Sequence, residues 1–265
     1  MPKQTEAAWF DSPDVLAVTF HPRREWDTGD AQGFEILDIP VADGVTVGAR
    51  FYAAGPEKPT ILFFHGNGEI VADYEDIAAL YVRMGVNFAP VDYRGYGRSS
   101  GRPTISSMLA DARTVFKYMR EWLAAKGYEG PVIVMGRSLG SASALEIASA
   151  YPTETAGLIV DSGFADVIAL LVRLGAGAPA GVSEDSLVRQ EQKMALYRGP
   201  TLIIHGTHDM IIPVRDADAL FKACPSAAKR LVKIEGAGHN NLMAAGLNEY
   251  MQAVTELVRS VDGGR

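Results

Sequence analysis

Short runs of β-branched and aromatic residues alternate along this chain with longer amphipathic stretches. The first two runs, 34–39 and 45–52, flank Asp43-Gly44, a dipeptide typical of a β-hairpin turn. The stretches between later runs carry apolar residues at three- and four-residue spacing, which indicates helices. Six later runs are mostly apolar, as in strands buried on both faces of a sheet: 60–64, 86–91, 131–135, 158–160, 201–204 and 231–234. The pattern predicts an α/β protein, with helices wrapped around a sheet.

Residues 164–198 interrupt this alternation. They begin apolar, pass through the Gly-, Ala- and Pro-rich segment 175–181, and end in a charged helical stretch. Glycine and proline at that density indicate a flexible connection between two short helices. We therefore predict a single domain over residues 1–265, with an N-terminal arm at 1–32 and a small cap inserted at 164–198.

A Gly-x-Ser-x-Gly motif stands at 136–140, between a predicted strand and a helical stretch at 141–150. A nucleophile elbow requires this strand–turn–helix context. The two glycines remove Cβ atoms that would clash in so tight a turn. Ser138 is therefore the candidate nucleophile, and the alternative is a serine that only caps a helix.

A serine hydroxyl is a weak nucleophile and needs a general base with an orienting acid. His239 is the preferred base because it lies on a Gly-rich turn after the last predicted strand. Asp209, which follows a strand between the serine and the histidine, is the preferred acid. Asp161, at the end of another strand, is its rival. The four remaining histidines suit the base less well: His21, His65, His205 and His208.

The negative charge of a tetrahedral intermediate needs preorganised donors, typically backbone N–H groups. We expect one from Leu139, directly after the nucleophile. The second is expected from Asn67, in the glycine-containing turn after an earlier strand, with Gly68 as the alternative. The residues predicted to line the substrate pocket follow strand ends or flank these groups: Gly66, Gly68, Glu69, Tyr93, Phe164 and Met210.

Composition narrows the class of protein. Hydrophobic residues make up 48% of the 265 positions, enough for a large core. A net charge of −7 argues against a nucleic-acid or anionic-membrane surface. Cys224, the single cysteine, is interpreted as a buried thiol.

We find no signal-peptide pattern and no apolar run near the ~18 residues of a membrane span. We therefore expect a cytoplasmic protein, of unspecified oligomeric state, that acts on a small molecule.

Five motifs in this order resemble those of the α/β-hydrolase superfamily. They are the oxyanion loop 65–69, the turn 92–99, the elbow 136–140, the acid turn 206–213 and the base turn 238–239. The chain is most similar to small-cap serine hydrolases, which include monoacylglycerol-lipase-like and depalmitoylase-like esterases. The resemblance implies a mostly parallel eight-stranded sheet flanked by helices, with a small helical cap after strand 6. It also implies a site with no cofactor and no metal.

These observations predict a serine hydrolase that cleaves carboxylic esters or thioesters through an acyl-enzyme on Ser138. The acyl group is expected to be short to medium, because the stretch 164–198 is too short to enclose a long chain. A serine peptidase or an acyltransferase on the same three residues remains an alternative. A non-catalytic binding module on this fold is the alternative from a different class.

Overall fold

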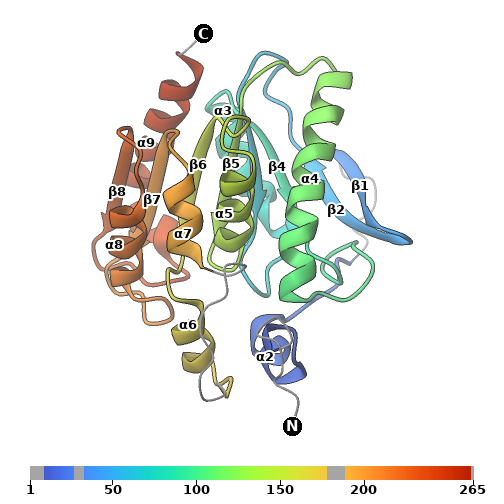
Figure 1. Cartoon of the computed structure of the whole chain (residues 1–265). Helices are drawn as coiled ribbons and strands as arrows, with labels where there is room; N and C mark the ends of the chain where they lie inside the picture. Colours follow the sequence, from blue (N-terminus) through green and yellow to red (C-terminus); the bar gives the residue numbers. More distant parts are fainter. Residues whose placement is uncertain (1–8, 27–32, 178–188, 264–265) are drawn as a thin grey trace.

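One eight-stranded sheet forms the centre of the computed structural model, which describes residues 9–26, 33–177 and 189–263 (Figure 1). The strand order is β1-β2-β4-β3-β5-β6-β7-β8. β1 (Glu35–Ala42) and β2 (Val45–Phe51) form the predicted hairpin, and β2 joins β4 antiparallel. The other six strands are mutually parallel: β3 (Thr60–Phe64), β4 (Asn87–Val91), β5 (Val132–Arg137), β6 (Gly157–Asp161), β7 (Thr201–Gly206) and β8 (Lys229–Ile234). The predicted mostly parallel sheet is confirmed.

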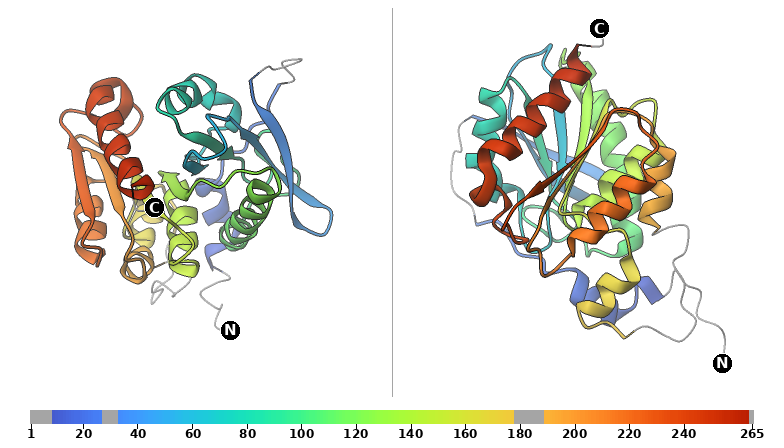
Figure 2. Two further views of the ribbon diagram at one scale, coloured as in Figure 1. Left: turned by 90° about the horizontal axis from the view of Figure 1, so that it is seen from above. Right: turned by 90° about the vertical axis from the view of Figure 1, so that its left-hand side faces the viewer.

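Helices cover both faces of this sheet (Figures 1 and 2). One face carries η1 (Val71–Tyr74), α3 (Glu75–Arg83) and α9 (Leu242–Asp262). The opposite face carries α4 (Ile105–Ala125), α5 (Gly140–Ala150), α7 (Gln190–Leu196) and α8 (Val214–Ala223). Two short helices, α2 (Pro13–Thr19) and α6 (Val167–Arg173), contact each other beyond one end of the strands (Figure 1).

The parallel strands are apolar because both of their faces are covered. All five residues of β3 are buried. Leu62 and Phe64 pack into the cluster that includes α4 and α5, whereas Ile61 and Phe63 pack into the cluster that includes α3 and α9. This alternation follows from the two-residue period of a strand. Burial of each such side chain contributes roughly 1.5–3 kcal/mol.

The predicted cap segment follows β6, and its described part divides between two positions. Asp166 caps α6 by accepting a hydrogen bond from the N–H of Ala169 at 2.8 Å. α7 instead packs against α5 and α8 in the helical layer. Residues 178–188 lie outside the described part of the chain, so the cap boundaries 164–198 and the arm boundaries 1–32 stay predictions. No helix in the described ranges is long and apolar enough to span a bilayer.

Candidate active site

Ser138 lies on a sharp turn between β5 and α5. Its φ of +51° falls in the left-handed region, which is uncommon for a serine. The flanking glycines are sterically required. A Cβ on Gly136 would lie 2.1 Å from the carbonyl oxygen of Gly140, and one on Gly140 would lie 2.0 Å from that of Phe64. The sequence Gly-x-Ser-x-Gly therefore folds into a tight strand–helix turn that exposes the serine side chain.

A chain of hydrogen bonds joins Ser138 to His239 and Asp209. His239 lies on the loop between β8 and α9, with its Nε2 2.8 Å from Ser138 Oγ and its Nδ1 2.6 Å from Asp209 Oδ2. Asp209 follows β7. Because the carboxylate accepts from Nδ1–H, Nε2 is left as an acceptor for the serine hydroxyl. The structure thus brings together the three residues that the sequence singled out.

Asp209 is held in its ionised form. Its Oδ1 accepts hydrogen bonds from the N–H groups of Ile211 at 2.9 Å and Ile212 at 2.8 Å. Burial opposes ionisation, but hydrogen bonds from His205 and His239 outweigh it and hold the pKa of Asp209 well below its usual range. The carboxylate is therefore a permanent negative partner for the His239 imidazole.

His205 is a second imidazole on the same carboxylate, and its position at a strand end gave no sign of this contact. Its Nε2 lies 3.4 Å from Asp209 Oδ2 and 2.8 Å from the carbonyl oxygen of Ile212. Burial favours neutral His205, but these hydrogen bonds raise its pKa above the ordinary value. His205 and His239 therefore contact the same oxygen, Oδ2, of the Asp209 carboxylate.

The rival acid, Asp161, has other partners. Its Oδ2 accepts a hydrogen bond from Tyr250 at 2.8 Å, and its Oδ1 accepts one from Ser162 at 2.8 Å. Both contacts are buried. In the described part of the chain, the carboxylate that contacts His239 is that of Asp209, so Asp209 is the acid that the geometry favours.

Two backbone N–H groups near Ser138 are free to donate. Leu139 stands at the N-terminal end of α5, where backbone N–H groups lack intrahelical partners. Asn67 lies in the loop between β3 and η1. Neither of these two N–H groups donates to another residue in the described part of the chain. Both groups therefore stay candidates for the predicted oxyanion donors.

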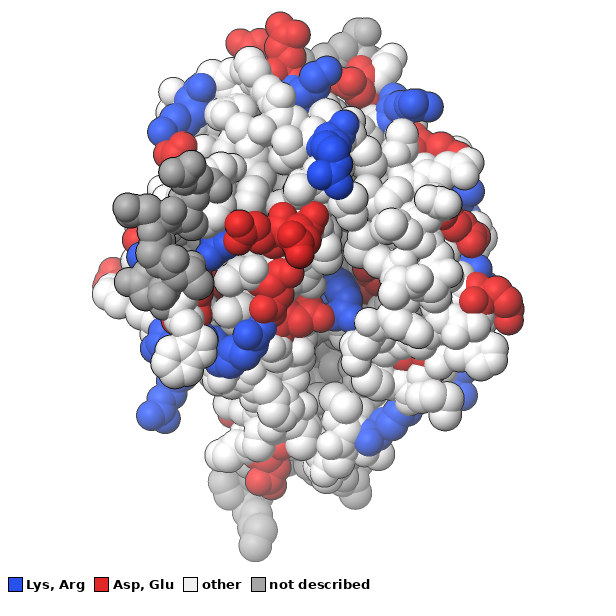
Figure 3. All heavy atoms as spheres, turned by 180° about the vertical axis from the view of Figure 1, so that it is seen from behind, with Lys and Arg blue, Asp and Glu red and all other residues white. Residues whose placement is uncertain are grey.

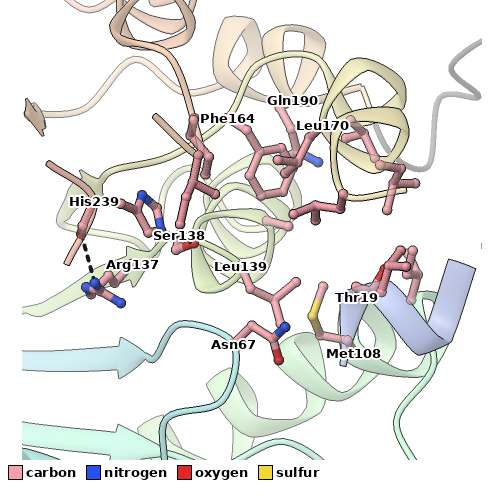
Figure 4. Close-up of a pocket in the computed structure, with 18 of the residues that line it drawn as sticks. Thr19, Asn67, Met108, Arg137, Ser138, Leu139, Phe164, Leu170, Gln190 and His239 are labelled. Atoms are coloured by element: carbon pink, nitrogen blue, oxygen red, sulfur yellow. Dashed lines mark hydrogen bonds between the residues drawn. The ribbon is translucent and has the colours of Figure 1, made fainter. Parts of the chain in front are cut away.

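A cavity of about 250 Å³ lies beside Ser138 (Figure 4). Its walls come from α2, α4, α6 and the elbow, and most are apolar. Representative wall residues are Val18, Met108, Leu109, Phe164, Leu170 and Leu171. In Figure 4, Ser138 and His239 lie at one end of this cavity and Thr19 lies across it. The arrangement provides an apolar pocket with Ser138, the candidate nucleophile, at one end.

Of the six residues predicted to line the pocket, Phe164 lines this cavity. Tyr93 is buried beneath the loop and donates a hydrogen bond to the His65 carbonyl at 2.6 Å. Met210 is 87% exposed. The side chain of Glu69 accepts hydrogen bonds from the N–H of Gly66 and from the hydroxyl of Tyr74, the last residue of η1. Gly66 and Gly68 shape the loop, and neither lines this cavity.

The residues that sequence reasoning missed come from α2 and α4. Met108 belongs to a stripe at helical spacing, and such a stripe normally packs in a core. Met108 instead lines the cavity, together with Ile105 and Leu109 of the same helix. Val18 and Thr19 carry no signal of their own, because only the folded chain brings α2 to this position.

Arg137, the residue between Gly136 and Ser138 in the motif, was not predicted to belong to the site. Its guanidinium pairs with Glu69 and donates hydrogen bonds to the His239 carbonyl at 3.0 Å and Asn240 Oδ1 at 3.1 Å. Burial disfavours the charge, but the nearby carboxylates of Glu69 and Asp161 outweigh it and raise the pKa of Arg137. Arg137 thus ties the elbow, the oxyanion loop and the base turn together.

A second cavity of about 340 Å³ lies on the other side of Arg137, between α3 and α9. Glu69, Asp73 and Asp161 line it together with tyrosine rings. Figure 3 shows this face of the molecule, where acidic side chains gather around a hollow that contains a basic one. Within the described ranges, no group of three or more His, Cys, Asp or Glu side chains is placed to hold a metal ion.

The sheet, the strand–turn–helix position of Ser138 and the order of the three linked residues define an α/β-hydrolase. The family described as "Serine aminopeptidase, S33" matches residues 55–180 and 183–244. The chain therefore belongs to this family of hydrolases.

Individual relatives agree with that assignment. The chain is 28% identical to human alpha/beta hydrolase domain-containing protein 17B, over 89% of this chain and 80% of that protein. It is 25% identical to protein bem46 of Schizosaccharomyces pombe, over 86% of this chain and 78% of that protein. Among solved structures, an esterase of Pyrococcus furiosus superposes with a TM-score of 0.72 at 17% identity, covering 90% of this chain and 98% of that one.

Proposed function

We propose that this hydrolase cleaves carboxylic esters or thioesters through an acyl-enzyme on Ser138. The observation that carries the proposal is the 2.8 Å contact between Ser138 Oγ and His239 Nε2, beside the available N–H groups of Leu139 and Asn67. A substrate carbonyl placed there would meet a nucleophile, its base and the donors for an oxyanion. The candidate triad and its substrates are inferred from this geometry.

The proposed reaction has two steps. His239 takes the proton of Ser138 as the hydroxyl attacks the acyl carbonyl, and Asp209 stabilises the imidazolium that forms. The N–H groups of Leu139 and Asn67 stabilise the negative oxygen of the tetrahedral intermediate. His239 then gives its proton to the leaving alcohol or thiol. A water molecule repeats the attack on the acyl-enzyme, again with His239 as the base, and releases the acid.

We assign the acyl group to the apolar cavity beside Ser138. Its volume of about 250 Å³ lies just below the roughly 300–1,000 Å³ of pockets that enclose drug-sized ligands. This supports a short to medium acyl chain. We expect kcat/KM for p-nitrophenyl esters to rise from acetyl to about octanoyl and then to fall. A steady rise from acetyl to palmitoyl would contradict the assignment.

The proposal is tested by an ester panel and a fluorophosphonate probe on the wild type and on Ser138→Ala. We expect the probe to label the wild type and not the variant. Turnover of the best ester should fall by about three or more orders of magnitude in the variant. Equal labelling of both proteins would contradict Ser138 as the nucleophile, and no labelling of the wild type would support the alternative of a non-catalytic binding module.

The same panel separates the remaining enzyme classes. The family description names aminopeptidases, and the structural relative from Pyrococcus furiosus is an esterase. The wild type should hydrolyse an ester and a thioester faster than an aminoacyl amide that carries a similar acyl group. Faster cleavage of the amide would favour a peptidase. Preferential acyl transfer to an added alcohol would favour an acyltransferase.

A further inference from the structure

The described part of the N-terminal arm passes directly over the loop that carries the candidate oxyanion donor. The N–H of His21 donates to Asn67 Oδ1 at 2.8 Å, and Asn67 Nδ2 donates to His21 Nδ1 at 2.7 Å. Because the amide NH₂ is a donor, the ring must accept on Nδ1. The side chain of Asn67 is thus paired on both of its polar atoms with one residue of the arm.

The hydroxyl of Tyr96 also bonds to both residues of the His21–Asn67 pair. Tyr96 is fully buried, accepts the N–H of His21 at 2.7 Å, and donates to Asn67 Oδ1 at 2.7 Å. Two donors on Oδ1 also fix which way the amide of Asn67 points. His21, Asn67 and Tyr96 therefore form a closed set of hydrogen bonds between the arm, the loop and the turn after β4.

Arg23 makes a second connection to the same loop. Its Nε donates to the Gly68 carbonyl at 3.0 Å, and its guanidinium pairs with Asp73. Asp73 in turn accepts the N–H of Ile70 at 3.0 Å. The arm itself is anchored independently, because the N–H of Gly97 donates to the Arg23 carbonyl at 2.9 Å. Arg23 therefore attaches the loop to a fixed part of the molecule.

The loop needs this support. Gly68 has a φ of +77°, a backbone conformation that residues with a Cβ rarely adopt, so the loop follows a path that its own side chains do not enforce. Within the loop, the backbone hydrogen bond from Glu69 N–H to the Gly66 carbonyl is long, at 3.4 Å. A donor contributes fully to oxyanion stabilisation only when it is already oriented before the reaction.

We propose that His21 and Arg23 are positioning residues, which hold the Asn67–Gly68 backbone so that the Asn67 N–H faces the oxyanion. The arm residues that make these contacts lie outside residues 55–180 and 183–244, the part matched by the family. This inference rests on the proposed function, since it concerns the same oxyanion. It assigns the arm a role in catalysis, whereas the sequence only ranked His21 below His239 as a candidate base.

The test compares His21→Leu, which removes the acceptor, with His21→Asn, whose Oδ1 can replace Nδ1. We expect kcat of His21→Leu to fall about tenfold on acetyl and octanoyl esters alike, less than the ~10²–10³-fold that loss of a whole donor causes. KM should change by less than about twofold, because the donor acts in the transition state. His21→Asn should recover most of kcat. Arg23→Met should lower kcat less than His21→Leu does, because its pair with Asp73 is partly exposed.

Asp14→Asn is the control, since Asp14 is exposed on α2 and lies outside the cavity. We expect its kinetics to match the wild type. Urea unfolding of each variant shows whether a loss of kcat follows a loss of stability. Wild-type kcat in His21→Leu, or an equal loss of kcat in His21→Leu and His21→Asn, would overturn the inference. A wild type that neither hydrolyses esters nor reacts with a fluorophosphonate would overturn the proposed function as well.

Discussion

The backbone of Ser138 is strained, and its neighbours hold it in place. A positive φ costs a residue other than glycine roughly 1–3 kcal/mol. The Ser138 N–H donates to the Asp161 carbonyl at 2.8 Å, and the Ser138 carbonyl accepts the N–H and the hydroxyl of Ser141 at 3.0 and 2.7 Å. Leu139, not Ser138, occupies the N-cap of α5. The geometry thus favours a nucleophile over a serine that only caps a helix.

Arg137 is the second residue on which the geometry of the site depends. We expect Arg137→Met to lower the free energy of unfolding by about 2–3 kcal/mol, because it removes a mostly buried cation from Glu69 and from the His239 carbonyl. It should also lower kcat, since the turn that carries His239 loses an anchor. Urea denaturation and ester kinetics measure the two effects.

Arg120→Met is the matched control for this prediction. Arg120 also pairs with a carboxylate, that of Glu154, but both side chains are more than 40% exposed. Exposed pairs of this kind contribute about 0.2–1 kcal/mol. Equal losses of stability in the two variants would contradict the role assigned to Arg137.

At the scale of elements, the proposed acyl pocket depends on two short helices, α2 and α6, that contact each other. α6 follows β6, and α2 precedes the sheet in the chain, yet both reach the cavity beside Ser138. α4 supplies the wall between them through Ile105, Met108 and Leu109. Since each helix contributes only a few side chains, one substitution should change the length of the pocket.

Val18→Phe tests this view of the pocket. We expect kcat/KM for an octanoyl ester to fall about tenfold, because the larger side chain occupies space that the acyl chain needs, while the acetyl ester changes by less than about twofold. Ala17→Phe places the same ring on an exposed position of α2 and should leave both esters unchanged. Equal losses for the two esters in Val18→Phe would indicate a disturbed site and contradict a length effect.

At the scale of the whole molecule, the lowered pKa of Asp209 makes the free energy of unfolding depend on pH in the acid range. Its folded pKa lies well below the ordinary value of about 3.9. Below that ordinary value the unfolded chain binds more protons than the folded one. The contribution of Asp209 to stability is therefore complete above about pH 4 and is lost as the pH falls toward the folded pKa.

The measurement is the free energy of unfolding of the wild type and Asp209→Asn between pH 6 and pH 3. We expect the difference between the two proteins to be constant above about pH 5 and to shrink as the pH falls below about 4. Asp14→Asn, which changes an exposed carboxylate, serves as the control. A difference that grew on acidification would contradict the depressed pKa.

Most of the architecture was predictable from local pattern. All eight strands coincide with predicted runs to within a few residues, because a strand buried on both faces has few alternatives to apolar residues. The elbow was predictable for a steric reason, since Gly136 and Gly140 have no room for a side chain. Asp209 and His239 follow strands that end at the same edge of the sheet as the strand before Ser138, so their positions in the chain favoured a meeting of the three residues. Asp161 ends another such strand, and only the folded chain shows that Asp209 is the carboxylate in contact with His239.

The pocket was much less predictable. Of the six predicted wall residues, Phe164 lines the cavity, while Met210 extends into solvent and Tyr93 supports the loop from inside. Position at a strand end brings a residue to the right edge of the sheet. The direction of its side chain depends on neighbours from other elements, which the local sequence does not specify.

The sequence by itself determined the buried strands, the tight turn at Ser138 and the order along the chain of the candidate nucleophile, acid and base. The strands follow from their burial on both faces, and the turn follows from short-range sterics. Tertiary structure alone decided the contacts that cross between distant segments. It set His205 on Asp209, Arg137 between two loops, and the arm residue His21 on Asn67. Such contacts depend on how separate elements pack against one another, and a polar contact between two single residues leaves no periodic pattern in the chain.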